Sequence, residues 1–495
     1  MDARRRLDGW QGRLGWVALA AGVVVFQLTF VSEITDSDST LYLDAAYSLL
    51  HPGSLPDRLP MVRPGLTLPL AAVIAVIGVT PLAARLLFAL ANAGTLLITY
   101  YLGERWLGRG VGWMSVALLL VTPQFHLLGN VVLPEGLMVF FGAAALAAWV
   151  AAARGSHPFR WAVCSGLSIG GAYLTKVTGL SLLAVLFALV FLAPWRQHPR
   201  RWRAMLVAAA TVAAVWLIEM GLFAAFTGDP WYRIRATHEL RVVHWQTYVA
   251  PRWWDGAAAF FAGANSWWRT HVAPLGSYGL LFWFAAAAVA WFAWRRQLLR
   301  VAWPLAWLGV LGLLLGAETM AYLDFYPRRF SPTLIPAVLL VALLFHDLRS
   351  QLGSHLTAFF AVPLATFGLA TIALLSVSPP LRFSVEHRAW DIAASLGAGQ
   401  TMVASDCRTI GFFRLYDRYR HPERFRDLSR VPVSALPRGA VVVLPDALPP
   451  ECLLLRRFDL AALTNAAGDW RWRGTVSRGD AAASAAGILR VFQVP

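Results

Sequence analysis

Residues 13–42 read RLGWVALAAGVVVFQLTFVSEITDSDSTLY, and this stretch decides how the rest of the chain is organised. Its apolar part, residues 14–31, is long enough to cross a bilayer as a helix. Because four arginines precede this segment, the positive-inside rule predicts that the N-terminus lies in the cytoplasm. Asp36 and Asp38 then emerge at the opposite face. No small-residue cleavage site precedes them, so we expect a retained transmembrane helix rather than a cleaved signal.

The composition is that of a membrane protein that crosses the bilayer many times. Of the 495 residues, 58% are hydrophobic and 14% are charged, whereas a soluble domain carries about 25% charged residues. The formal net charge of +16 comes mostly from short arginine clusters between apolar runs. Such clusters set topology and contact lipid headgroups, so nucleic-acid binding is not expected. Lys176 is the only lysine among 43 basic residues.

Eleven apolar runs are long enough, or nearly so, for a spanning helix. They lie near residues 14–31, 82–103, 111–128, 136–153, 161–175, 177–194, 204–226, 274–294, 302–321, 332–347 and 356–378. A shorter run at 65–79 contains Pro69. If it crossed, the five arginine-rich connections that follow would all lie outside, against the positive-inside rule. We therefore interpret it as re-entrant or interfacial, and we predict a mainly α polytopic fold with about eleven transmembrane helices.

This topology places four connections together on the outer face. They are the first outer loop at 32–64, the turn at 129–135, the long outer loop at 227–273 and the turn at 322–331. Side chains that come from distant parts of the sequence are therefore expected to meet on one side of the membrane.

The sequence changes character near residue 379, and we divide it into a transmembrane domain (1–378) and a C-terminal domain (379–495). Strand-like runs alternate there with polar and proline-containing turns, at 401–404, 440–444 and 488–494. This pattern predicts a small soluble α/β domain on the outer side. Cys407 and Cys452 can form a disulfide in an exported domain, but the sequence does not decide whether they pair.

Asp38 is the first candidate for chemistry. Residues 40–50 have apolar side chains at helical spacing and predict an amphipathic helix along the interface. At the start of this helix Asp38 is either a base or ligand, or a helix N-cap, for which Asp is a favoured residue. Helix capping would explain why an acid stands at position 38 but not why a second acid stands at position 36.

Glu135 and Lys176 are expected on the same side of the membrane. Glu135 follows Pro134 at a helix start, a position where the helix dipole favours an acid on structural grounds alone. Lys176 lies in a polar break between two apolar runs. A lysine there either snorkels to the surface or meets an anion. We favour phosphate binding, because a compact ammonium suits a phosphate oxygen.

Several other charges lie in unusual places. Arg63, Arg328 and Arg329 are predicted outside, against the positive-inside trend, which favours an anionic ligand. Arg329 is preferred over its neighbour because it abuts the next helix. Glu219 lies deep in an apolar run and is functional by default, but the sequence does not name its partner. The histidines of the long outer loop have no metal-ligand spacing.

Taken in order, these motifs resemble those of the polytopic glycosyltransferases of the C-type fold. The resemblance is to the branch that contains dolichyl-phosphate-mannose–protein mannosyltransferases and the bacterial aminoarabinose transferases of lipid A, and it extends over residues 14–350. The motifs are Asp38 with Tyr42 four positions later, Arg63-Pro64, Pro134-Glu135, Leu174-Thr175-Lys176, and Arg329 with Pro332 and Pro336.

The chain departs from the family pattern at three of these motifs. Ser39 stands where family members often have Glu directly after the first Asp. Glu135 stands where the second acid is usually Asp. Arg63, Pro64 and Gly65 stand where the family usually has Lys and another Pro.

The resemblance implies transfer of a sugar, with inversion, from a polyprenyl-phosphate donor at the outer face of a bacterial inner membrane. Asp38 would be the general base on an acceptor hydroxyl, with Asp36 and Glu135 as further catalytic candidates. If the acceptor is itself a phosphate, it needs no base and Asp38 would position groups. The donor site would comprise Lys176, which holds the leaving phosphate, with Tyr42, Arg63, Arg328 and Arg329.

Several alternatives stay open at this point. The carboxylates of Asp36, Asp38 and Glu135 are candidates for a divalent ion such as Mg²⁺, Mn²⁺ or Zn²⁺, and no cofactor is certain. The acceptor is a lipid, a glycan or a protein. A transporter or flippase of lipid-linked glycans, or a polymerase that uses pyrophosphate-linked glycans, is the alternative function. The chain shows no internal repeat, which disfavours a transporter.

Overall fold

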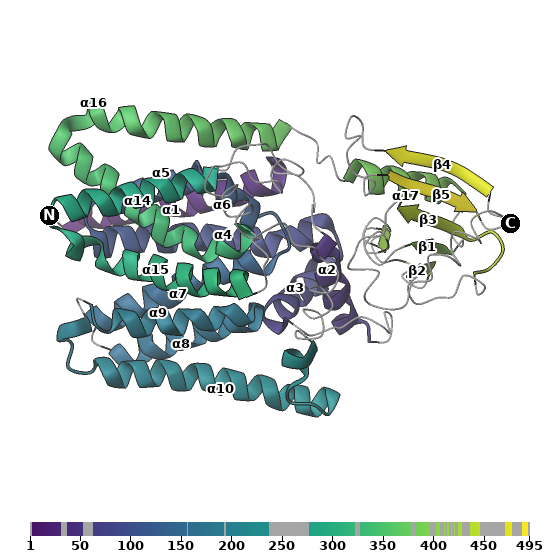
Figure 1. Ribbon diagram of the computed structural model, residues 1–495, viewed down its shortest axis with the longest axis horizontal. Coiled ribbons are helices and arrows are strands. Elements are labelled where there is room, and N and C mark those ends of the chain that lie inside the picture. Colours follow the sequence, from purple (N-terminus) through teal and green to yellow (C-terminus); the bar gives the residue numbers. More distant parts are fainter. Residues whose placement is uncertain are drawn as a thin grey trace.

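The computed structural model describes residues 2–30, 37–52, 63–155, 157–192, 195–236, 277–321, 327–377 and 383–396, together with parts of 402–493. Up to residue 396 the described chain is helical. Figure 1 shows a bundle of long helices with the N-terminus at one end, α2 and α3 at the other, and the C-terminal sheet beyond them.

The helices of the bundle begin and end as follows. They are α1 (Asp2–Phe30), α2 (Ser37–Leu50), α3 (Pro64–Ile77), α4 (Pro81–Leu102), η1 (Gly103–Leu107), α5 (Val111–Leu120), α6 (Pro123–Leu128), α7 (Pro134–Arg154), α8 (Pro158–Thr175), η2 (Val177–Leu180), α9 (Ser181–Leu189), η3 (Trp195–Gln197), α10 (Arg201–Thr227), α14 (Ser277–Trp294), α15 (Leu298–Ala321), η4 (Pro327–Thr333) and α16 (Leu334–Val377). A last helix, α17 (Phe383–Leu396), belongs to the C-terminal region.

Many of these helices have the length and composition of membrane spans. Five of the described helices are long and apolar enough to cross a bilayer, at Leu82–Leu107, Pro134–Arg154, Arg201–Thr227, Leu298–Glu318 and Phe330–Gln351. Shorter apolar helices accompany them. The chain is therefore a multi-pass membrane protein, as the sequence predicts.

The helix boundaries differ from the predicted runs at two places. The run at 111–128 is broken into α5 and α6, because Pro123 cannot continue the backbone hydrogen bonds of a helix and instead starts a new one. The runs at 332–347 and 356–378 lie in one assigned helix, α16, which curves back at the N-terminal end of the bundle in Figure 1. The number of eleven crossings stays a prediction.

The interpretation of residues 65–79 as a short piece agrees with α3. This helix has 14 residues and therefore rises about 21 Å, less than the roughly 30 Å of a hydrocarbon core. It packs against α2, and both helices lie between the bundle and the C-terminal sheet (Figure 1). α2 is more enclosed than the predicted interfacial helix, since Thr40, Leu43 and Asp44 are all fully buried.

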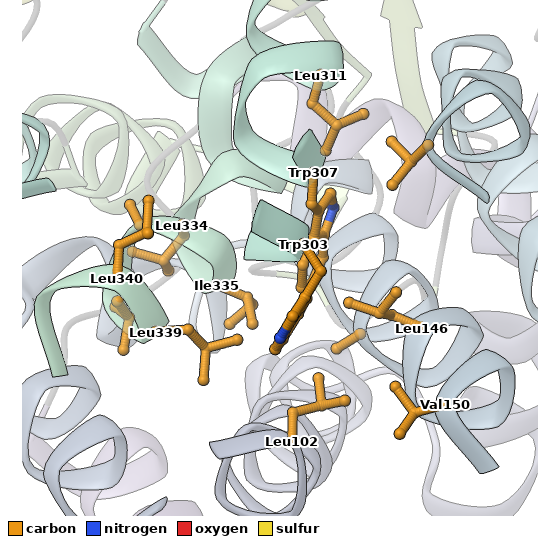
Figure 2. Packing of buried hydrophobic residues seen from close by; sticks show 14 of the residues in the cluster. Leu102, Leu146, Val150, Trp303, Trp307, Leu311, Leu334, Ile335, Leu339 and Leu340 are labelled. Atoms are coloured by element: carbon orange, nitrogen blue, oxygen red, sulfur yellow. The ribbon is translucent and has the colours of Figure 1, made fainter. Parts of the chain in front are cut away.

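Aromatic side chains of α15 fill the centre of the bundle. Figure 2 shows Trp303 and Trp307 between Leu146 and Val150 of α7 and residues such as Ile335 of α16. Helices in a membrane associate through such close packing, because lipid is as apolar as their side chains. This packing fixes α15 beside α7, the helix that carries Glu135 at its start.

α8 and α10 approach each other closely because α8 has small residues at its interface. A Cβ on Gly166 would lie 2.6 Å from the carbonyl oxygen of Ala208, and one on Gly170 would lie 2.8 Å from Val215 Cγ2. This is the small-xxx-small packing of membrane helices. The outward face of α10 is apolar and exposed, as expected beside lipid, at Leu206, Leu217, Ile218, Leu222 and Phe226.

The described C-terminal region contains a five-stranded mixed sheet in the order β2-β1-β3-β5-β4. Its strands are β1 (Val403–Ser405), β2 (Phe425–Asp427), β3 (Val441–Pro445), β4 (Arg471–Ser477) and β5 (Ile488–Gln493). β1 pairs in parallel with β2 and β3, whereas β5 pairs antiparallel with β3 and β4. α17 packs on this sheet. The predicted strands at 401–404, 440–444 and 488–494 correspond to β1, β3 and β5.

Two predictions for this region lie outside the described residues. The domain boundary between 378 and 379 falls in an undescribed segment. Cys407 and Cys452 also lie outside the described residues, so their pairing stays a prediction.

Candidate active site

Three helix ends meet at the end of the bundle that lies beside α2. α7 begins at Pro134 and carries Glu135 in its first turn. α8 ends at Thr175, and Lys176 is its C-cap. Arg63 immediately precedes α3. The sequence places these residues on one face of the membrane, and the structure brings them into one cluster.

Lys176 and Glu135 form a largely buried ion pair. Nζ of Lys176 lies 3.0 Å from Oε1 of Glu135, and the two side chains are 14% and 5% exposed. Burial lowers the pKa of the Lys176 ammonium, and the positive charge of Arg63 lowers it further. The negative charges of Glu135 and Glu318 act in the opposite direction. Lys176 is therefore not a lysine that snorkels freely to the surface, because a carboxylate fixes its direction.

Gly65 explains how α3 can begin directly against the end of α8. A Cβ at this position would lie 2.6 Å from the backbone nitrogen of Thr175 and 2.7 Å from the carbonyl carbon of Leu174. Only glycine fits such a backbone contact. The departure from the family pattern at Arg63-Pro64-Gly65 is therefore a packing feature, and it brings the residue before Lys176 next to the start of α3.

Gly65→Ala is expected to lower the free energy of unfolding by about 1–3 kcal/mol, the usual cost of overpacking. The added methyl group meets backbone atoms of Leu174 and Thr175, which cannot rotate away. Thermal unfolding of the purified protein in detergent measures the effect. Gly309→Ala is the matched control, because a Cβ at Gly309 in α15 meets nothing within 4 Å. Equal melting temperatures for the two variants would contradict the tight contact.

α2 is held against this cluster at its first turn. The Ser39 hydroxyl is buried and donates to the carbonyl oxygen of Val132 at 3.3 Å, just before the start of α7. Ser39 stands where the family often has Glu, and its short side chain makes this contact with the backbone. Further along α2, the ring of Tyr42 lies 5.3 Å from the guanidinium carbon of Arg63 in a cation–π contact.

The remaining predicted residues are placed only through their backbone. Asp38 lies in the first turn of α2, beside Ser39, as the sequence predicts for a residue at a helix start. Arg328 and Arg329 lie in η4, which packs against α7 and α15. Their side chains and that of Asp38 lie outside the described part of the structure, as does the whole of Asp36. The roles predicted for these four residues stay predictions.

One carboxylate oxygen of Glu135, a candidate ligand for a divalent ion, is already in an ion pair. The ammonium of Lys176 contacts Oε1 of Glu135, and it occupies the direction from which a cation would approach that oxygen. Among the described residues, no group of three or more His, Cys, Asp or Glu side chains gathers as a metal centre would require. A divalent ion held by Asp36, Asp38 or Glu135 stays a prediction.

α2 is also joined to the C-terminal region, which the sequence does not foretell. Arg414 Nη1 donates to Asp44 Oδ2 at 2.8 Å, and these side chains are 8% and 0% exposed. Arg414 also donates to the carbonyl oxygen of Phe425 in β2 at 3.4 Å. The C-terminal region therefore packs on the same helix that carries Asp38.

Besides Asp44 and Arg414, the residue Glu318, whose charge influences Lys176, was also missed by the sequence analysis. It lies near the C-terminal end of α15, and its negative charge favours the charged form of Lys176. A signal was present, because an acid near the end of an apolar run is costly in a membrane helix. For Glu219 the structure supplies the missing partner, Arg233, at 2.6 Å.

One known protein family matches part of the chain. Residues 62–218 match the dolichyl-phosphate-mannose-protein mannosyltransferase family, which is about a third of the chain. The matched segment contains Arg63, Glu135 and Lys176. No curated protein sequence matches the chain.

Comparison with solved structures establishes the fold. ArnT from Cupriavidus metallidurans in the apo state is 12% identical, with 98% of each chain covered and a TM-score of 0.61. The same protein bound to undecaprenyl phosphate is 14% identical, with 98% of each chain covered and a TM-score of 0.58. An Archaeoglobus fulgidus oligosaccharyltransferase tethered to an acceptor peptide is 14% identical, with 93% of this chain and 72% of that chain covered and a TM-score of 0.51. These findings confirm the resemblance that the sequence predicts: the chain is a multi-pass membrane protein with the C-type glycosyltransferase fold, similar over residues 62–218 to the mannosyltransferase family.

Proposed function

We propose that this chain transfers a sugar from a polyprenyl-phosphate donor to an acceptor at the outer face of a bacterial inner membrane, with inversion at the anomeric carbon. The observation that carries the proposal is the buried Lys176–Glu135 pair with Arg63 beside it, inside the segment that matches the mannosyltransferase family. Two cations held at the end of a membrane bundle suit the phosphate of a lipid whose chain lies in the bilayer.

The donor phosphate is the leaving group in this reaction. As the bond between the anomeric carbon and the phosphate oxygen breaks, negative charge grows on that oxygen. Lys176 and Arg63 stabilise this charge, and Arg328 and Arg329 complete the anionic site from η4. Glu135 keeps the ammonium oriented, and with Arg328 and Arg329 the four cations of the proposed site outnumber its two acids, Glu135 and Glu318. Undecaprenyl phosphate is the ligand of ArnT, the relative with the same fold, and we assign the same class of carrier here.

Asp38 serves the acceptor side of the reaction. Its position in the first turn of α2 is next to Ser39, which is bonded to the turn that precedes Glu135. Asp38 takes the proton of an acceptor hydroxyl as the oxygen attacks the anomeric carbon and polyprenyl phosphate departs. A phosphate acceptor needs no base, and Asp38 then positions it. The sugar and the acceptor, whether lipid, glycan or protein, remain to be identified by experiment.

The proposal is tested by incubating the purified chain in lipid nanodiscs with a panel of radiolabelled polyprenyl-phosphate sugars and candidate acceptors. We expect one donor to be consumed, with release of polyprenyl monophosphate and appearance of label on the acceptor. Consumption only of pyrophosphate-linked donors would instead identify a polymerase. Movement of intact donor across vesicles without consumption would identify a flippase. A parallel reaction with a chelator tests the predicted divalent ion, because loss of activity that Mg²⁺, Mn²⁺ or Zn²⁺ restores would support it.

A further inference from the structure

Glu219 belongs to a buried polar cluster that the proposed reaction does not use directly. It lies in α10 and is 5% exposed, within a strongly apolar helix. Oε1 accepts a hydrogen bond from Arg233 Nη1 at 2.6 Å, and Oε2 accepts one from the Tyr173 hydroxyl at 2.5 Å. Arg233 follows α10 in the chain and is itself only 3% exposed. A charge pair removed from water in this way is retained only if it makes further hydrogen bonds.

Those further hydrogen bonds go to the last turn of α8. Arg233 Nη2 donates to the carbonyl oxygen of Tyr173 at 2.7 Å and to that of Leu174 at 3.2 Å. The guanidinium carbon lies 4.7 Å from the centre of the Tyr173 ring. Carbonyls in the final turn of a helix have no partner within the helix, and a guanidinium fork is suited to hold two of them at once.

The two carbonyls lie directly before Thr175 and Lys176. The backbone of Leu174 and Thr175 also contacts Gly65 at the start of α3. The segment that leads to Lys176 is therefore held by α3 and by Arg233. Glu219 fixes the guanidinium that makes the second of these contacts. Such a shell of secondary contacts is what holds a binding side chain within a fraction of an ångström of its working position.

We propose that Arg233, oriented by Glu219, is a positioning residue for Lys176 and thereby sets the affinity of the site for the donor phosphate. This rests on the proposed function, because it takes Lys176 as the phosphate-binding lysine. It is independent of Glu135, which contacts the ammonium itself.

Lys176 is the only lysine of the chain, so amine-reactive labelling followed by peptide mapping reports on it directly. We expect Glu219→Gln/Arg233→Gln to increase the labelling rate of Lys176 by about fivefold or more, because local opening of the α8 end exposes the amine. The double change removes both charges and leaves neither one buried alone. Its matched control is Asp229→Asn/Arg235→Gln, a nearby pair whose arginine side chain is 65% exposed. Equal rates in wild type and the Glu219/Arg233 variant would overturn the inference.

A milder variant keeps the test valid if the double variant does not fold. Arg233→Lys keeps the charge pair with Glu219 but cannot hold two carbonyls with a fork. We expect kcat/KM for the donor to fall about tenfold and the affinity for polyprenyl phosphate to fall with it, because a displaced Lys176 binds the phosphate less tightly and stabilises less of the charge that grows on it. Loss of activity with an unchanged affinity for polyprenyl phosphate, measured by direct binding, would point to a general loss of folded enzyme and contradict the positioning role. Absence of donor consumption by wild type would refute the proposed function, whereas the labelling result would still decide the role of Arg233.

Discussion

Asp38→Asn is expected to lower kcat for transfer to a hydroxyl acceptor by about 10²- to 10⁴-fold, the range that a positioned general base supplies. Asparagine has nearly the same shape and can still cap the start of α2, so the helix should form as before. It cannot accept the proton of the acceptor hydroxyl. The loss should therefore appear in kcat, measured with the donor and acceptor that the panel identifies.

The matched control for this prediction is Asp36→Asn, which removes the neighbouring carboxylate and is expected to change kcat much less. Both variants should insert into the membrane and melt at the temperature of the wild type. An Asp38→Asn enzyme with normal kcat on a hydroxyl acceptor would falsify the assignment of Asp38 as the base. Loss of activity with both hydroxyl and phosphate acceptors would instead support a role in positioning.

Lys176→Gln is expected to lower kcat/KM for the donor by about 10²- to 10³-fold, as removal of one group that stabilises transition-state charge does. The ammonium is the best-placed cation of the described cluster, held 3.0 Å from Glu135. The substitution also removes the ammonium that pairs with Glu135, and the negative charge of this buried carboxylate then repels a phosphate. Steady-state kinetics and direct binding of polyprenyl phosphate measure the two consequences.

Lys176→Gln/Glu135→Gln separates the loss of the ammonium from the effect of a stranded carboxylate. If the second substitution restores full activity, Lys176 only neutralises Glu135 and does not bind phosphate. Lys176→Arg adds a pH test. Burial lowers the pKa of Lys176 from 10.5, so wild-type kcat/KM should fall on the alkaline side before an exposed lysine would lose its charge. Arginine stays charged at that pH, so this alkaline fall should be absent in Lys176→Arg.

The helical membrane fold and the grouping of three charged residues could be predicted because charge and apolar length act over whole segments. Arginine clusters fixed the side of each connection, and this placed Arg63, Glu135 and Lys176 together before any distance was known. By the same reasoning, residues 65–79 were interpreted as re-entrant or interfacial, and the 14-residue length of α3 agrees with a short element. Helix ends were predicted less well, since the break before Pro123 depends on one residue inside an otherwise continuous apolar run.

The contacts that complete the site were not predictable, because they join residues with no common local pattern. Asp44 and Arg414 are 370 positions apart. Arg233 follows an apolar helix in an aromatic-rich stretch, and nothing nearby in the sequence marks it as the partner of Glu219. Ser39 and Gly65 were noticed only as departures from the family pattern. The structure explains both residues by the backbone that lies against them: Val132 beside Ser39, and Leu174 and Thr175 beside Gly65. Such a contact cannot be read from the sequence.

The pair between Asp44 and Arg414 has a consequence for the order in which the chain acquires its structure. Asp44 lies in α2 and is made early, whereas Arg414 is made only when most of the chain has been synthesised. Until Arg414 is made, the carboxylate of Asp44 lacks the guanidinium with which it pairs in the finished structure. α2 is thus among the earliest segments to leave the ribosome but completes this contact only late in synthesis, and a chain truncated before Arg414 would be released without it.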